Sequence, residues 1–138
     1  MVLRTEAVRR RLTRLEEIQS TLAGLDYKPN SPESAWAVER GLHLAAECVF
    51  DIGNHILSAG FGTSIDGYEL ILDALAERGV IEKELRLNLA GFGGFRNILV
   101  HGYLDLDPER VQDAHEKAPK LFSLYRLQIE RWMTTREE

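Results

Sequence analysis

Residues 3–22, LRTEAVRRRLTRLEEIQSTL, decide the fold class, because their apolar residues recur at steps of three and four. The apolar positions of the helical repeat are Val8, Leu12, Leu15, Ile18 and Leu22. This spacing places them on one face of an α-helix, which predicts a helix with one buried side. No segment of the chain alternates apolar and polar residues as a half-buried strand would. We therefore expect an all-α protein.

Helical spacing continues from this stretch toward the C-terminal end of the chain. The expected helices cover residues 3–22, 32–58, 67–78, about 81 to the segment around Arg96, and 108 onward, with Pro119 as a candidate interruption. Asp107 before Pro108 supplies an N-cap and then a proline in the first turn, as helix starts commonly do. About five helices with short connectors predict an up-and-down bundle. A length of 138 residues predicts one domain over residues 1–138.

The composition excludes several classes of function. The net charge is −5, whereas a protein that grips nucleic acid along its backbone needs a basic face, so broad nucleic-acid binding is disfavoured. Cys48 is the only cysteine, which excludes an intramolecular disulfide and a cysteine-built zinc site. No apolar run is long enough to span a bilayer. These features predict a protein of the reducing cytoplasm with no membrane partner.

A glycine cluster precedes the segment that holds the most reactive residues. Gly91, Gly93 and Gly94 fall within the expected fourth helix, where each glycine costs roughly 1 kcal/mol relative to alanine. Two interpretations are open: a break between two shorter helices, or a close approach by a neighbouring helix or a second subunit. The segment that follows reads Arg96-Asn97-Ile98-Leu99-Val100-His101-Gly102-Tyr103.

Arg96 and His101 are candidates for phosphate binding and proton transfer. A histidine near neutral pKa can move a proton, and an arginine can bind a phosphate and stabilise the charge that develops on it. Together they suit RNA cleavage without a metal, by activation of the 2′-hydroxyl. On an ideal helix the two residues lie about 140° apart, so they converge only if the helix bends, the arginine reaches round, or a second subunit completes the site. From residue types alone, surface ion pairs and a helix cap are the more common explanation.

The segment from Arg96 to Tyr103 resembles the Arg-x-x-x-x-His-x-Tyr signature of HepT-like toxins, which belong to the HEPN superfamily. Supporting stretches follow in the family's order at residues 37–40, 47–56, 68–70, 75–81 and 91–92. The resemblance covers residues 36–103. It implies the HEPN fold and a homodimer in which the two motifs face each other across the interface.

The resemblance also implies a function and a regulator. It implies a metal-independent endoribonuclease, the toxin of a type VII-like toxin–antitoxin pair, with an RNA substrate such as tRNA or mRNA and no cofactor. Arg96 and His101 would be the catalytic pair, with Asn97 as a supporting residue. The partner would be a cognate minimal nucleotidyltransferase antitoxin that adenylylates Tyr103. Bulky, anionic AMP groups there would block the cleft and repel RNA phosphates.

Polar residues also form a stripe on the expected second helix. The stripe consists of Arg40, His43, Glu47, Asp51 and Asn54. A solvated face is the ordinary explanation, while the resemblance favours Asp51 and Asn54 as supporting residues that line the cleft opposite the motif. His43 and Glu47 have the spacing of two metal ligands, but no third ligand follows at a matching spacing, so we expect no metal.

Two other functions are compatible with the same helices. The first is a catalytically silent HEPN dimer that binds and regulates a nucleotidyltransferase, which loss of activity on mutation of His101 would separate from the nuclease. The second is a nucleotide-binding HEPN domain, which tight binding of free ATP by the isolated protein would favour.

Overall fold

A computed structural model describes residues 3–137 and confirms the all-α expectation. Within these residues there are α-helices, one π-helical turn and no strand. The elements are α1 (Thr5–Ala23), α2 (Pro32–His55), η1 (Ile56–Gly60), α3 (Tyr68–Glu77), α4 (Lys83–Asn88), α5 (Phe92–His101) and α6 (Pro108–Glu137). The last helix begins where the sequence predicts, since the Asp107 carboxylate accepts a hydrogen bond from the Glu109 N–H at 3.0 Å.

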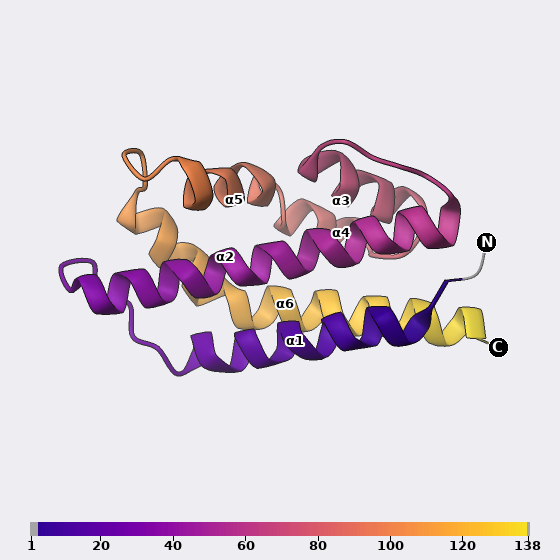
Figure 1. Ribbon diagram of the computed structural model, residues 1–138, viewed down its shortest axis with the longest axis horizontal. Coiled ribbons are helices and arrows are strands. Elements are labelled where there is room, and N and C mark those ends of the chain that lie inside the picture. Colours follow the sequence, from indigo (N-terminus) through magenta and orange to yellow (C-terminus); the bar gives the residue numbers. More distant parts are fainter. Residues whose placement is uncertain (1–2, 138) are drawn as a thin grey trace.

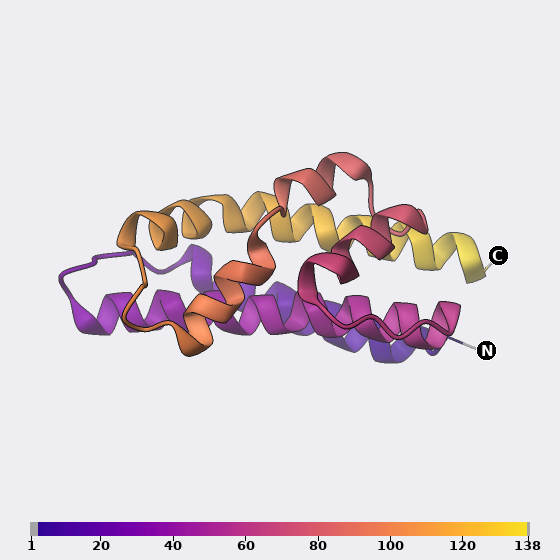
Figure 2. The ribbon, with the colours of Figure 1, turned by 90° about the horizontal axis from the view of Figure 1, so that it is seen from above.

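Three long helices form the base of the bundle, and three shorter ones cover one side of it. α1 packs against both α2 and α6, and these helices run lengthwise along the molecule (Figure 1). α3, α4 and α5 lie on the opposite side of α2 from α1, and α5 packs against α2 and α3 (Figures 1 and 2). The helix that carries the reactive segment therefore rests on the polar stripe of α2 and on the start of α3.

A single hydrophobic core joins these layers. All five apolar positions of the opening stretch are buried on α1, as their spacing predicts. The largest fully buried side chain belongs to Tyr125 of α6, whose hydroxyl donates a hydrogen bond to the Val49 carbonyl oxygen at 2.7 Å. Among residues 3–137, no helix has both the length and the apolar character needed to cross a bilayer.

The structure decides two points of helix continuity that the sequence leaves open. The expected fourth helix is split into α4 and α5, because Gly91 adopts a left-handed backbone conformation (φ 83°) that a helix cannot continue through. α6 runs through Pro119 without the interruption considered for it. The Pro119 carbonyl oxygen accepts a hydrogen bond from the Gln19 amide of α1 at 2.8 Å, which ties α6 to α1 at this point.

Candidate functional site

The glycine cluster fixes α5 against α3. The Glu69 carboxylate, in the first turn of α3, accepts hydrogen bonds from the N–H groups of Gly91 at 3.0 Å and of Gly93 at 2.7 Å. This carboxylate caps the start of α5, where unpaired N–H groups and the helix dipole favour a negative charge. A Cβ atom on Gly93 would lie 2.6 Å from the Tyr68 Cβ, whereas one on Gly94 would meet nothing within 4 Å. Both interpretations of the cluster therefore hold within one chain: a helix break at Gly91 and a close approach at Gly93.

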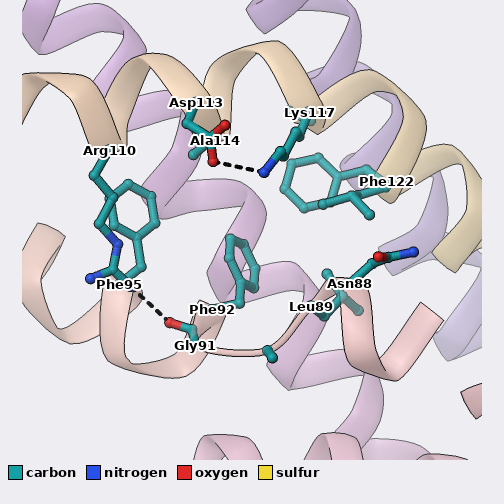
Figure 3. A pocket seen from close by; sticks show the side chains of 13 residues that line it. Asn88, Leu89, Gly91, Phe92, Phe95, Arg110, Asp113, Ala114, Lys117 and Phe122 are labelled. Atoms are coloured by element: carbon teal, nitrogen blue, oxygen red, sulfur yellow. Dashed lines mark hydrogen bonds and ion pairs between the residues drawn. The ribbon is translucent and has the colours of Figure 1, made fainter. Parts of the chain in front are cut away.

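A small pocket lies behind this break, between the start of α5 and α6. Its volume is about 130 Å³, and aromatic side chains that include Phe92, Phe95 and Phe122 line it (Figure 3). Arg110 of α6 donates a hydrogen bond to the Gly91 carbonyl oxygen at 3.1 Å and lies over the Phe95 ring (Figure 3). Arg110 thus holds the start of α5 from the α6 side, while Glu69 holds it from the α3 side.

Arg96 projects from α5 toward α2. Its Nε donates to Glu47 Oε1 at 2.6 Å, and its guanidinium carbon lies 5.0 Å from the centre of the Tyr68 ring. Its Nη1 also donates to the Asn97 side-chain oxygen at 3.3 Å, which places the predicted supporting residue in contact with the predicted catalytic arginine. Only 15% of the Arg96 side chain is exposed. The Arg96 guanidinium is therefore held between Glu47 of α2 and Tyr68 of α3.

Glu47 also contacts the histidine one turn earlier on α2. His43 Nε2 lies 3.6 Å from Glu47 Oε1, and His43 Nδ1 lies 2.9 Å from Arg40 Nη1. Burial lowers the pKa of His43, and the nearby positive charges of Arg40 and Arg96 lower it further, although the Glu47 carboxylate opposes the shift. Most of the polar stripe on α2 is thus part of a charged network that ends at Arg96.

The sequence showed this stripe but not its role. As a sequence pattern, Arg40, His43 and Glu47 indicate a solvated face, and His43 with Glu47 has the spacing of an incomplete metal pair. Glu47 and Arg96 are separated by 49 residues, and no local pattern joins them. The ion pair between Glu47 and Arg96 becomes predictable only once α5 is known to pack against α2.

His101 and Tyr103 lie at the other end of α5. His101 is the last residue of the helix and is exposed, and Tyr103 in the following turn has 82% of its surface exposed. Within residues 3–137, no hydrogen bond or ion pair joins the His101 ring to Arg96. The helix does not bring the predicted pair together inside one chain.

Asp51 and Asn54 line a groove beside the ion pair between Arg96 and Glu47. This groove has a volume of about 450 Å³, and Glu47 and Tyr68 also line it. The Asp51 carboxylate also binds α1, since its Oδ2 accepts a hydrogen bond from Arg11 Nε at 2.6 Å. Asn54 is exposed.

Known proteins resemble this chain over almost its full length. Residues 8–126 match the family described as ribonuclease HepT-like. The chain belongs to this family. The family expected from the sequence is thereby confirmed, together with the ribonuclease class.

Three relatives of this HepT-like protein illustrate the match. A protein named tRNA nuclease HepT from Aphanizomenon flos-aquae is 34% identical over 136 residues, which cover 98% of this chain and 90% of that protein. The Bacillus subtilis cytosolic protein YutE, of unknown function, superposes with a TM-score of 0.82 at 22% identity, over 97% of this chain and 93% of that one. A tri-AMPylated HEPN toxin from Shewanella oneidensis, solved in complex with an MNT antitoxin, gives a TM-score of 0.80 at 20% identity, with 90% and 96% of the two chains covered. The structural likenesses confirm the HEPN fold.

Proposed function

We propose that this HepT-like protein is the toxin of a toxin–antitoxin pair, an endoribonuclease that cuts RNA without a metal. The observation that carries the proposal is the placement of Arg96 and His101 on one short helix, with Arg96 paired to Glu47 of α2 and His101 exposed at the C-terminal end. The 34% identity to a tRNA nuclease supports tRNA as the substrate class.

The proposed reaction uses the ribose 2′-hydroxyl as the nucleophile. The His101 imidazole accepts the 2′-hydroxyl proton, and the 2′-oxygen forms a bond to the adjacent phosphorus while the bond from phosphorus to the 5′-oxygen breaks. The leaving 5′-oxygen takes a proton from the imidazolium or from water. Arg96 balances the negative charge that develops on the phosphate oxygens. The products are a 2′,3′-cyclic phosphate and a free 5′-hydroxyl.

The proposed active form is a homodimer. Arg96 is turned toward α2, whereas His101 is exposed at the far end of α5, so one chain presents the two groups on different sides of the helix. Two copies with their α5 helices face to face would place the groups of one motif opposite those of the other. The exposed turn that holds Tyr103 would then lie at the mouth of the shared cleft.

The exposure of Tyr103 supports a role as the modification site. A nucleotidyltransferase antitoxin would transfer AMP from ATP to the tyrosine oxygen and release pyrophosphate. The tyrosine needs to be reachable by a second active site, and 82% of its surface is exposed. The AMPylated toxin that shares this fold supports the same partner and chemistry for this chain. Added AMP groups two residues from His101 would repel the phosphates of an incoming RNA.

The test uses purified protein whose intact mass shows no adenylyl group. Labelled tRNA is incubated in EDTA with the wild type, Arg96→Ala, His101→Ala and the control variant Glu16→Gln, which lies on α1. We expect cleavage with cyclic phosphate ends by the wild type and the control, and none by the other two. Intact RNA with verified unmodified wild type would contradict the proposal and favour a silent dimer that regulates its nucleotidyltransferase.

A further inference from the structure

The geometry points to Glu47, steadied by His43, as the positioning residue that sets the orientation of Arg96 for cleavage. This inference rests on the proposed ribonuclease function, because it assigns Arg96 a phosphate to hold. Glu47 touches neither His101 nor Tyr103 in the part of the chain that the structure describes, so its effect would pass through the arginine.

The Glu47 contact leaves the two Nη groups of the Arg96 guanidinium for phosphate recognition. A guanidinium has five N–H donors in a rigid plane, and the two Nη groups carry four of them. Glu47 Oε1 takes the Nε–H at 2.6 Å, which leaves the Nη groups for other acceptors. Asn97 takes one Nη1 donor at 3.3 Å. Within residues 3–137, the other three N–H donors of Arg96 make no hydrogen bond, so they could bind phosphate oxygens.

The arginine is held on a second side by an aromatic ring. The guanidinium carbon lies 5.0 Å from the centre of the Tyr68 ring, within the range of a cation–π contact. Phe50 in turn packs against Tyr68, with ring centres 4.6 Å apart, so the ring itself is fixed from behind. An arginine with two such contacts and 15% exposure has lost most of its rotamer freedom before any substrate binds. That is the pre-organisation from which transition-state stabilisation benefits.

His43 restricts the carboxylate in turn. Arg40 can only donate, so its Nη1 contact at 2.9 Å makes His43 Nδ1 the acceptor of a neutral ring. The remaining proton then lies on Nε2, which faces Glu47 Oε1 at 3.6 Å. Burial lowers the pKa of His43 and favours that neutral form. Glu47 Oε1 thus lies between two N–H groups: it accepts a hydrogen bond from Arg96 Nε at 2.6 Å, and His43 Nε2 stays just beyond hydrogen-bonding distance at 3.6 Å.

Glu47 places a negative charge next to the arginine that is proposed to bind the phosphate. Its charge repels RNA, so its removal should strengthen binding if electrostatics were its only effect. If Glu47 instead positions Arg96, its removal should slow turnover. Loss of Glu47 should lower kcat and leave KM unchanged or lower, because the arginine then has to find its orientation in each catalytic cycle.

The test compares Glu47→Ala and Glu47→Gln with the matched control Glu16→Ala. Glu16 Oε2 accepts from Arg126 Nη1 at the same distance of 2.6 Å, but this pair joins α1 to α6 and lies away from the motif. We expect Glu47→Ala to lower kcat by about 10- to 100-fold without raising KM, as for a misplaced catalytic group. Glu47→Gln keeps an acceptor for the Nε–H and should fall between this variant and the wild type. The control should cleave like the wild type.

A second readout does not depend on cleavage. In ¹⁵N NMR spectra, the Arg96 Nε–H signal should exchange slowly with water in the wild type and in Glu16→Ala, and rapidly in Glu47→Ala. An active wild type whose kcat and Nε–H exchange are unchanged by Glu47→Ala would overturn the positioning role alone. An unmodified wild type that cuts no RNA, with the Nε–H still protected by Glu47, would overturn the proposed function.

Discussion

Substitution of two neighbouring glycines by alanine should change stability in opposite directions. Gly93 and Gly94 both lie in α5 and neither has a positive φ, so alanine fits the backbone of both. Each replacement should gain up to about 1 kcal/mol from helix propensity. The packing around each new Cβ atom decides whether this gain is kept. The Cβ of Gly94→Ala would enter open space, so that variant should keep it.

The Cβ of Gly93→Ala would collide with α3. It would lie 2.6 Å from the Tyr68 Cβ and 2.7 Å from Glu69 Oε2. The carboxylate can swing away, but the Tyr68 Cβ moves only with its backbone, so α5 has to separate from α3. Overpacking of this kind costs about 1–3 kcal/mol, and the weakened charge-assisted hydrogen bond from the Gly93 N–H adds about 1 kcal/mol. The net loss should be about 1–3 kcal/mol.

Thermal unfolding followed by circular dichroism measures this difference for the two variants and the wild type. At roughly 4 °C per kcal/mol for a domain of this size, Gly93→Ala should melt about 4–12 °C below the wild type, and Gly94→Ala at or above it. Gly93→Ala should also lower RNA cleavage at temperatures where it is folded, because α5 carries Arg96. A Gly93→Ala protein as stable as Gly94→Ala would refute the argument from close approach.

Four further measurements probe the core, the Cys48 thiol and the start of α5. Tyr125→Phe should lower the free energy of unfolding by about 1–2 kcal/mol, because the buried Val49 carbonyl oxygen loses a donor; equal urea midpoints would contradict this. Burial raises the pKa of Tyr125, so stability should be unaffected below the usual tyrosine pKa of about 10 and fall as the pH rises above it, with tyrosinate absorbance appearing as the protein unfolds. Burial likewise raises the pKa of the Cys48 thiol, so iodoacetamide at pH 8 should modify the folded protein more slowly than the urea-unfolded chain, and equal rates would show that the thiol is accessible. Glu69→Gln should speed amide hydrogen exchange at Gly93, and unchanged exchange would show that the carboxylate does not cap α5.

Local periodicity predicted the parts of the fold that depend on neighbours along the chain. The five apolar positions of α1 are buried because a helix places residues three and four apart on one face whatever it packs against. The start of α6 followed from Asp107 and Pro108 for the same local reason. The break at Gly91 was only one of two interpretations, because a glycine cluster permits several backbone conformations and the packing of α5 on α3 selects among them.

The site shows the opposite case. The segment from Arg96 to Tyr103 was found as a motif, since its residues are contiguous. The ion pair between Glu47 and Arg96 could not be predicted, because two residues 49 positions apart form no periodic pattern in the sequence. From the sequence, His43 is a member of a polar stripe and half of an incomplete metal pair. Its contact with Glu47 has meaning once α5 is known to cross α2 at that turn.

Cleavage of matched RNAs with and without 2′-hydroxyl groups tests the central claim most directly. One tRNA is prepared unmodified and one fully 2′-O-methylated, and both are incubated in EDTA with unmodified wild type and His101→Ala. The account predicts that the wild type cuts the unmodified RNA alone, leaving cyclic phosphate ends, and that His101→Ala cuts neither. Cleavage of the methylated RNA by the wild type, or of either RNA by His101→Ala, would contradict attack by the 2′-hydroxyl with His101 as its base.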